Sequence, residues 1–219
     1  MIKLLNTDCM EYMKGLEDNA FELAIVDPPY GIDAGNAFGG EQRKSGNGAA
    51  LKTAFTIKDW DLGIPDKNYF DQLMRVSKNQ IVWGANYMSH HLPPSMGWVV
   101  WDKDNGTTKF SDAELAFTSF GRALRIYKYT WNGMIQGCMK NKEVRIHPTQ
   151  KPVKLYEWLL ANYAKKGDKI LDTHLGSGSS AIAAHYSGFE FVGCELDSDY
   201  YKAAQARLDK ETAQIDIFQ

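Results

Sequence analysis

The chain has 219 residues, of which 44% are hydrophobic and 24% are charged, and its net charge is −2 at neutral pH. That length can bury one substantial core, no apolar run reaches the roughly 18 residues of a membrane span, and the N-terminus shows no signal-peptide pattern. The small net charge argues against a general polyanion binder, while three cysteines without metal-like spacing (Cys9, Cys138 and Cys194) indicate a reducing cytoplasm and no metal site.

Apolar, β-branched runs alternate with helical patterns along the chain, which is typical of an α/β sheet. A strand is predicted at 22–26, a helix at 69–76, and further strands at 80–85, 97–102 and 113–120. The next helix is predicted over 151–164, with Pro152 tolerated in its first turn. Strand, glycine turn, helix and strand follow over 169–195, and a last helix over 197–211 is capped by Asp197 or Ser198.

Two stretches stand apart from this alternation. Residues 31–58 contain six glycines and few large apolar side chains, so we expect a mobile loop there. Residues 121–154 hold eight basic residues against one acid, which fits either a DNA-binding face or an ordinary solvated basic face. The candidate DNA contacts in this stretch are Arg122, Arg125, Lys128, Lys140, Lys142 and Arg145.

A glycine-rich turn follows the strand predicted to end at Asp172. In "ILDTHLGSGSSAIAA", Gly176, Ser177 and Gly178 open the next helix. The spacing Gly-x-Gly-x-x-Ala is a loose match to the dinucleotide-binding fingerprint, and Glu195 ends the next strand near the place of the ribose-binding acid. The segment therefore indicates an adenosine-containing cofactor, with a plain tight turn of an α/β protein as the alternative.

The carboxylate of Asp172 favours one class of adenosine cofactor over another. A dinucleotide places its pyrophosphate at the helix N-terminus, where the backbone amides and the helix dipole attract anions. An extra carboxylate beside that site would repel the pyrophosphate. S-adenosylmethionine carries an ammonium and a sulfonium instead, and both attract a nearby carboxylate. The charge of Asp172 therefore favours S-adenosylmethionine, with a dinucleotide such as NAD as the alternative.

The tetrapeptide Asp27-Pro28-Pro29-Tyr30 directly follows the strand predicted at 22–26. Neither proline has an N–H, each fixes φ near about −65°, and Pro28 is held extended because a proline follows it. The corner thus offers a carboxylate, outward carbonyl oxygens and a flat ring. Two acceptors suit an –NH₂ group and a flat face suits a heterocycle, so the corner is a candidate seat for the exocyclic amine of a nucleobase. The alternative is a rigid turn with a helix-capping aspartate.

Three segments, in this chain order, resemble those of the amino-methylating DNA methyltransferases, and most closely their β class. They are the corner from Asp27 to Tyr30, "HPTQKP" at 147–152, and "LDTHLGSGSS" at 171–180. The resemblance covers nearly the whole chain. It departs from the family where the usual "DPF" before the glycine turn reads "DTH", and where the short segment before His147 leaves little room for a target-recognition domain.

The resemblance implies a permuted Rossmann-like fold, a mostly parallel sheet with helices on both faces. It implies a single domain over 1–219, with a short target-recognition segment at about 121–146. It further implies that Asp8 bonds the adenine amine of the cofactor, against the alternative of a helix cap, and that the segment from His147 to Lys151 lines the methionine end or caps the next helix. The residues expected at the cofactor are Asp8, Cys9, Asp27, His147, Thr149, Lys151, Asp172, Leu175, Gly176, Ser177, Gly178, Ser179, Glu195 and Leu196.

The chemistry implied by the resemblance is methyl transfer from S-adenosylmethionine to N6 of adenine in duplex DNA. The catalytic corner would be Asp27, Pro28, Pro29 and Tyr30. Hydrogen bonds from the target amine to the Asp27 carboxylate and the Pro28 carbonyl would stabilise the positive charge that develops on the nitrogen. The base would be flipped out of the duplex and stacked on Tyr30, with the loop at 31–58 closing over it or filling the gap.

Methylation at N4 of cytosine is the nearest alternative, although Asp27 favours adenine because serine more often stands there in N4-specific members. Methylation at C5 of cytosine needs a cysteine nucleophile, usually after proline, and no cysteine here has that context. A non-catalytic binding subunit is disfavoured by the intact corner, and an NAD-dependent oxidoreductase by Asp172. The expected partner is duplex DNA in the cytoplasm of a bacterial or phage-infected cell, near the nucleoid and away from membranes. A second copy of the chain and a cognate restriction endonuclease are further candidate partners.

Overall fold

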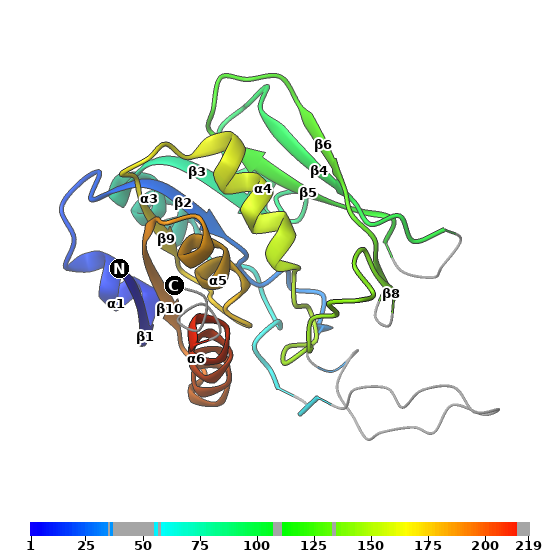
Figure 1. The fold of residues 1–219 in the computed structure, drawn as a ribbon. Helices are drawn as coiled ribbons and strands as arrows, with labels where there is room; N and C mark the ends of the chain where they lie inside the picture. Colours follow the sequence, from blue (N-terminus) through cyan, green and yellow to red (C-terminus); the bar gives the residue numbers. More distant parts are fainter. Residues whose placement is uncertain (35, 37–54, 57, 107–110, 133–134, 214–219) are drawn as a thin grey trace.

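The computed structural model describes residues 1–34, 36, 55–56, 58–106, 111–132 and 135–213. At its centre lies an eight-stranded sheet with the order β1-β10-β9-β2-β3-β5-β4-β6 (Figure 1). Strand β5 runs antiparallel to both of its neighbours, and the other neighbouring pairs are parallel. This mostly parallel sheet, covered by helices on both faces, confirms the predicted fold class.

The strands of the sheet come from the apolar runs of the sequence, and the central ones are buried on both faces. In β2, Leu23 and Ile25 join the core on one side of the sheet, while Ala24 and Val26 join the core on the other, which explains the unbroken apolar run. A separate two-stranded ladder pairs β7 (Trp131–Asn132) with β8 (Ile135–Gln136). The strands of the main sheet are β1 (Ile2–Asn6), β2 (Phe21–Val26), β3 (Ser77–Trp83), β4 (Trp98–Asp102), β5 (Ala113–Thr118), β6 (Arg125–Lys128), β9 (Lys169–Asp172) and β10 (Glu190–Glu195).

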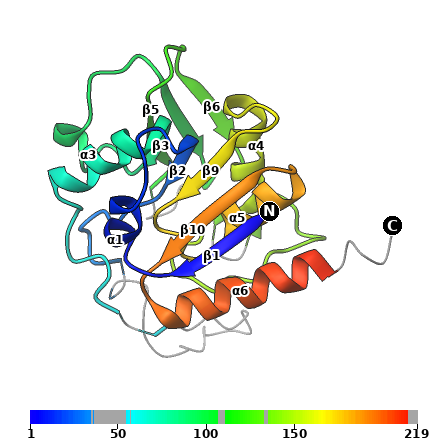
Figure 2. The same ribbon diagram turned by 90° about the vertical axis from the view of Figure 1, so that its left-hand side faces the viewer.

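The helices divide between the two faces of the sheet (Figure 2). Helices α1 (Cys9–Lys14) and α3 (Lys67–Val76) pack on one face, and α4 (Val153–Tyr163), α5 (Ser179–Tyr186) and α6 (Ser198–Ala213) pack on the other. A single 3₁₀ turn, η1 (Ser89–His91), follows β3. Within the described ranges, no helix combines the length and the apolar character needed to cross a membrane.

The element boundaries follow local chemistry. Strand β3 ends before Gly84, which has φ of +65°, so the strand is shorter at this end than the predicted 80–85. Pro152 precedes α4 as its N-cap rather than standing inside the first turn. Helix α6 is capped by Asp197, whose Oδ1 accepts hydrogen bonds from the backbone N–H groups of Asp199 and Tyr200, and this decides between the two predicted caps.

Some elements were not predicted from the sequence. Strand β1, at the sheet edge, has one buried residue among half-buried and exposed ones, and helix α1 is a short element of 6 residues. Strand β6 is mostly exposed, and β7 and β8 have only 2 residues each, so these strands lack the apolar runs that mark the central strands. The loop predicted at 31–58 lies mostly outside the described residues.

The topology brings three acidic residues to one edge of the sheet. Strands β10, β9 and β2 are neighbours and parallel, so their carboxyl ends meet at the same edge. Glu195 ends β10, Asp172 ends β9 and Asp27 follows β2 directly. In open α/β sheets, ligands bind outside this edge, and the candidate site is found there.

Candidate active site

A cavity of about 540 Å³ opens at the carboxyl edge of the sheet. It gathers side chains from the N-terminus, from the Asp-Pro-Pro-Tyr corner, from the segment before α4 and from the glycine turn. Asp66, Tyr69, Tyr156 and Tyr200 also line it. Sequence reasoning did not place them there, because Asp66 caps α3 and the three tyrosines lie within helices that carry no recognised motif. The predicted site residues that line the cavity are Asp8, Cys9, Asp27, Pro29, His147, Thr149, Lys151, Leu175, Gly176, Ser177, Ser179, Glu195 and Leu196.

The glycine turn between β9 and α5 is held by the carboxylate of Glu195. Gly176 and Gly178 have φ of +52° and +74°, in the left-handed region that glycine enters without steric cost. The backbone N–H of Gly176 donates to Glu195 Oε2 at 2.8 Å, and that of Asp197 donates to Oε1 at 2.9 Å. Burial raises the pKa of Glu195. The acid expected at the ribose therefore also fixes the shape of the turn.

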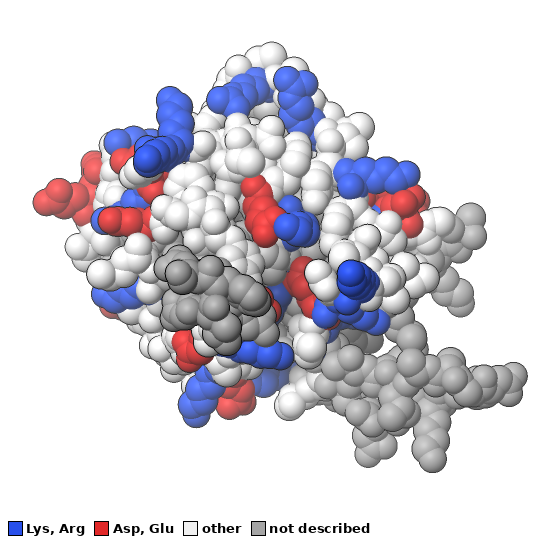
Figure 3. Space-filling view, viewed as in Figure 1, with Lys and Arg blue, Asp and Glu red and all other residues white. Residues whose placement is uncertain are grey.

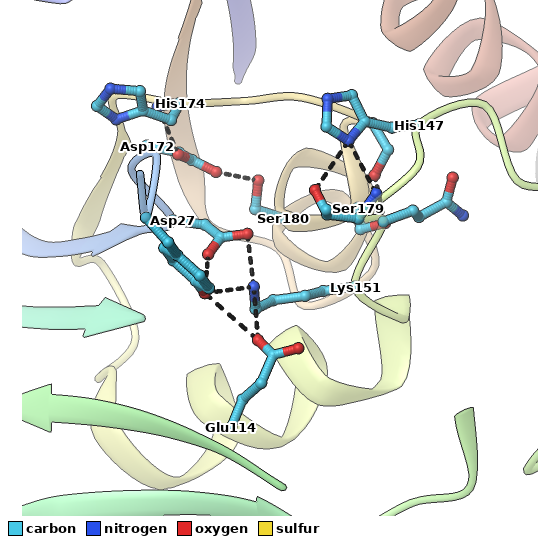
Figure 4. A network of polar contacts seen from close by, with 12 residues as sticks. Asp27, Glu114, His147, Lys151, Asp172, His174, Ser179 and Ser180 are labelled. Atoms are coloured by element: carbon cyan, nitrogen blue, oxygen red, sulfur yellow. Dashed lines mark hydrogen bonds and ion pairs between the residues drawn. The ribbon is translucent and has the colours of Figure 1, made fainter. Parts of the chain in front are cut away.

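Asp172 occupies a different position from the one predicted. Its carboxylate is buried and accepts hydrogen bonds from Ser180 Oγ at 2.6 Å and from the backbone N–H of His174 at 3.0 Å (Figure 4). Burial raises its pKa to about 7. Neither Asp172 nor Gly178 is among the residues that line the cavity, and Gly178 instead faces Ala204 of α6. The charge argument for the cofactor therefore cannot rest on Asp172.

The charge of the cavity lining comes from other carboxylates, and it favours S-adenosylmethionine over a dinucleotide. Lys151 is the one lysine or arginine among the cavity-lining residues within the described chain. Burial, with Lys151 and Arg145 nearby, lowers the pKa of His147 to about 3, so the imidazole is neutral at physiological pH. A lining of this charge would repel a pyrophosphate but suits the ammonium and sulfonium of S-adenosylmethionine, so the residues present fit this cofactor. The acidic residues that line the cavity are Asp8, Asp27, Asp66, Glu195 and Asp197.

Asp8 caps a helix and also lies at the cavity. Its Oδ1 accepts a hydrogen bond from the backbone N–H of Met10 at 2.7 Å and caps α1. The same residue lines the cavity. Because a carboxylate has two oxygens with several lone pairs, capping the helix is compatible with contact to a ligand amine.

The carboxylate of Asp27 is tied to two side chains. Its Oδ1 accepts a hydrogen bond from the Tyr30 hydroxyl at 2.6 Å, and its Oδ2 pairs with Lys151 Nζ at 2.6 Å (Figure 4). Burial raises the pKa of Asp27, and the charge of Lys151 opposes that rise. Lys151 was expected at the methionine end of the cofactor, and its ammonium instead lies against Asp27 because the chain enters α4 beside the end of β2.

The ring of Tyr30 is packed against the turn after β3. It stacks on Tyr87, with ring centroids 5.2 Å apart and planes at 17°. A Cβ at Gly84 would lie 2.1 Å from the Tyr30 ring, so the ring reaches this close only because position 84 is glycine. Tyr87 itself is 44% exposed. The ring expected to stack on the target base thus already has an aromatic neighbour, and neither Tyr30 nor Pro28 is among the residues that line the cavity.

The backbone after the corner is held by Asp61, a buried residue that sequence reasoning missed. Its Oδ1 accepts from the N–H groups of Tyr30 at 2.6 Å and Gly31 at 2.9 Å, and its Oδ2 accepts from Ala34 at 2.9 Å. Three backbone donors on one carboxylate fix the chain where it leaves the site. No local pattern marks Asp61, because its partners lie about thirty residues earlier in the chain.

The predicted DNA-contacting residues differ in their surroundings. Arg125, Lys140 and Lys142 are exposed. Lys128 pairs with Asp104 at 2.9 Å. On the face in Figure 3, lysine and arginine side chains are separated by acidic and uncharged groups rather than forming one continuous patch.

Two of the predicted arginines bond to the protein's own backbone. Arg122 donates to the backbone oxygen of Asn162 at 2.7 Å. Arg145 is half-buried, donates to the backbone oxygen of Pro148 and lies over the ring of Phe55. Its guanidinium is therefore held inward rather than presented as the exposed cation that was predicted.

Comparison with known proteins decides the family. Residues 78–206 match the family model for N6 and N4 methyltransferases, described as DNA methylase. The chain belongs to this family. Over 250 aligned residues it is 25% identical to the Type II methyltransferase M.HpaI of Haemophilus parainfluenzae, and the alignment covers 95% of this chain and 74% of that protein.

Solved structures of methyltransferases share the fold. The M1.HpyAVI–SAM complex aligns with a TM-score of 0.56 at 18% identity, over 94% of this chain and 100% of that chain. The PvuII DNA methyltransferase (cytosine-N4-specific) aligns with a TM-score of 0.59 at 12% identity, over 97% of this chain and 90% of that chain. At these identities the likeness concerns the fold alone.

Membership of the DNA methylase family confirms the resemblance that the sequence motifs predicted. The protein is a DNA amino-methyltransferase, and S-adenosylmethionine is its methyl donor. The family takes in both N6 and N4 chemistry, so membership alone does not choose between adenine and cytosine.

Proposed function

We propose that this DNA methyltransferase transfers its methyl group to N6 of adenine, after the base has been flipped out of the duplex. The observation that carries the proposal is the carboxylate of Asp27, which lies at the cavity edge where β2 ends. In the related N4 enzymes serine more often stands at this position. The carboxylate of Asp27 therefore favours adenine N6.

The residues of the corner orient the target amine and stabilise its charge. When bound, S-adenosylmethionine supplies an electrophilic methyl group on a sulfonium. The carboxylate of Asp27 and the carbonyl of Pro28 accept the two amine hydrogens, and both interactions strengthen as the nitrogen becomes positive. The Pro28-Pro29 backbone keeps these acceptors in place because it has little conformational freedom to lose. The corner thus accelerates the reaction by holding its two hydrogen-bond acceptors in place before the amine arrives, and no covalent intermediate forms on the protein.

The other predicted residues take supporting roles in this proposal. Asp8, Glu195 and the backbone at Gly176 bind the adenosine part of the cofactor. Tyr30, supported by its stack on Tyr87 at 5.2 Å, forms an aromatic wall for the extruded base. The exposed cations Arg125, Lys140 and Lys142 contact DNA phosphates.

The test is transfer of labelled methyl groups from S-adenosylmethionine to duplex DNA that contains all four bases, followed by digestion to nucleosides. We expect the label in N6-methyl-2′-deoxyadenosine. Label in N4-methyl-2′-deoxycytidine would contradict the assignment to adenine and keep the family assignment. The Asp27→Ala variant is the control, because background labelling would persist in it and enzymatic labelling would not.

A further inference from the structure

A buried ammonium lies between two carboxylates beside the catalytic corner (Figure 4). Lys151 Nζ is 2.6 Å from Asp27 Oδ2, 3.0 Å from Glu114 Oε2 and 3.1 Å from the Tyr30 hydroxyl oxygen. The Lys151 side chain is 3% exposed. An ammonium has three donors, and here each donor has an acceptor within hydrogen-bonding distance.

Glu114 comes from a part of the sheet that carries no recognised motif. It lies on β5, the strand that runs antiparallel to its neighbours. Its other oxygen, Oε1, pairs with Lys103 Nζ at 2.6 Å. Although burial disfavours the charge, Lys151 and Lys103 lower the pKa of Glu114 to about 2. The cluster thus contains two carboxylates and two ammonium groups.

The target amine and Lys151 require the same acceptor. Both oxygens of Asp27 are engaged, Oδ1 by the Tyr30 hydroxyl and Oδ2 by Lys151. An amine that approaches Asp27 Oδ2 competes there with the ammonium of Lys151. A buried ammonium without its partners is strongly disfavoured, so Lys151 can yield Asp27 only if another anion retains it. Glu114 Oε2, already 3.0 Å away, meets this requirement.

We propose that Glu114 is a positioning residue for methyl transfer, which retains the Lys151 ammonium while Asp27 accepts the target amine. Glu114 acts through Lys151 and does not itself contact the base. Its negative charge also balances Lys151 as the amine nitrogen becomes positive nearby. The inference rests on the proposed role of Asp27 as the acceptor of the amine.

The first test is single-turnover methylation by Glu114→Gln. Without Glu114, Asp27 is the only carboxylate left in this cluster to pair with Lys151. The target amine then competes less well with Lys151 for the Asp27 carboxylate. We expect the rate to fall about 10- to 100-fold, the range for removing one charge-assisted hydrogen bond, with the Kd for S-adenosylmethionine unchanged. The matched control is Glu157→Gln, which removes a carboxylate of similar exposure, 25% against 20%, that pairs with Lys154 at 2.6 Å, and it should keep the wild-type rate.

The second test distinguishes positioning from structural support. In Glu114→Gln/Lys151→Gln no ammonium competes for Asp27, so the double variant should be faster than Glu114→Gln alone. If Glu114 only supported the fold, removing a second buried partner would slow the enzyme further. Glu114→Asp keeps the charge on a shorter side chain and should fall between wild type and Glu114→Gln, which covers the case in which the glutamine variant does not fold.

The pH profile gives a third readout. Asp27 must be ionised to accept the amine, so the rate rises with pH through its pKa. Lys151 lowers that pKa and Glu114 raises it. The pH range over which the methylation rate rises should therefore move to higher pH in Lys151→Gln and to lower pH in Glu114→Gln. Four further groups that interact with Asp27, namely Tyr30, Tyr69, Tyr156 and Asp172, are the same in both variants.

Two results would overturn the inference. One is a Glu114→Gln rate within twofold of wild type, and the other is a double variant slower than Glu114→Gln. Failure of the proposed function gives a different result, because Asp27→Ala would then also retain its rate. Loss of activity in Asp27→Ala together with full activity in Glu114→Gln would remove the role of Glu114 and leave that of Asp27.

Discussion

The cofactor side and the target side of the cavity are constructed differently. On the cofactor side, three bonds that fix the glycine turn join residues 2, 8 and 19 positions apart within the segment from β9 to β10, and Arg207 of α6 donates to the backbone oxygen of Ser177 from 30 positions away. On the target side, Asp27 pairs with Lys151 from 124 positions away, and Tyr30 is held by Asp61 from 31 positions away. The contacts of the glycine turn are thus mostly local, and those of the corner are long-range.

The two sides also differ in the chemical groups that make their contacts. Around the glycine turn, carboxylates mostly accept hydrogen bonds from backbone N–H groups, which every residue except proline has. Around Asp27, charged side chains neutralise one another, and removal of one leaves another buried without a partner. The target side should therefore respond more sharply than the cofactor side to single substitutions.

The largest effect on stability is expected at Gly84, on the target side. Alanine there must adopt φ of +65° and place Cβ 2.1 Å from the Tyr30 ring. The backbone and overpacking costs together should lower the free energy of unfolding by about 2–4 kcal/mol. The control is Gly188→Ala, in the turn before β10 and away from the cavity, with φ of +73° and no described atom within 4 Å of the added Cβ, so its free energy of unfolding should fall by only about 1–2 kcal/mol. Equal decreases in urea unfolding would show that the Tyr30 ring is not tightly packed.

The next effect concerns the cofactor side and Glu195. S-adenosylmethionine at a hundred times its Kd should add about 2.7 kcal/mol to the stability of the wild-type protein. Glu195→Ala should remove most of that increment, because it deletes the carboxylate and releases the N–H of Gly176. The comparison is between thermal midpoints with and without cofactor for each variant. Glu190→Ala, at the exposed start of the same strand, should retain the increment, and retention in Glu195→Ala as well would exclude Glu195 from the cofactor site.

The smallest effect is expected outside both sides of the cavity, at the exposed cations. Replacing Arg125, Lys140 and Lys142 with glutamine should reduce the slope of log affinity against log salt by about 0.9 for each DNA phosphate that is no longer neutralised. The affinity for the cofactor, which does not involve DNA, should stay unchanged. The control replaces Lys165, Lys166 and Lys202, which are also exposed. If both triple variants bind DNA with the wild-type slope, the predicted basic stretch is an ordinary solvated surface.

The same difference between local and long-range contacts explains which features could be predicted. The order of central strands and helices followed from apolar runs that are long because both faces of the sheet are covered. Strands β1 and β6 were not predicted, because they are edge strands in which few residues are buried and no long apolar run forms. The cavity-lining residues Asp8, Gly176 and Glu195 were predicted because each lies in or beside a short motif at a strand end.

The remaining parts of the site could not be predicted from local patterns. The position of Asp172 depends on the side chain of Ser180, which turns the carboxylate inward. The ion pair of Asp27 with Lys151 depends on where α4 begins relative to β2, and the contribution of Glu114 depends on the reversed direction of β5. Asp61 reaches the corner through a segment with no periodicity. These contacts follow from packing of the whole chain rather than from any one segment.

The central claim is that Asp27 accepts a hydrogen bond from the target amine, and single-turnover methylation by Asp27 variants tests it most directly. Asp27→Asn keeps an oxygen at this position, whereas Asp27→Ala leaves no side-chain acceptor. We expect the rates to fall in the order wild type, Asn and Ala, with a loss of about 10²–10³ in Ala, while cofactor titration of the same proteins gives nearly unchanged affinity. An Ala variant that methylates within tenfold of wild type would contradict the account and leave Asp27 as a structural corner.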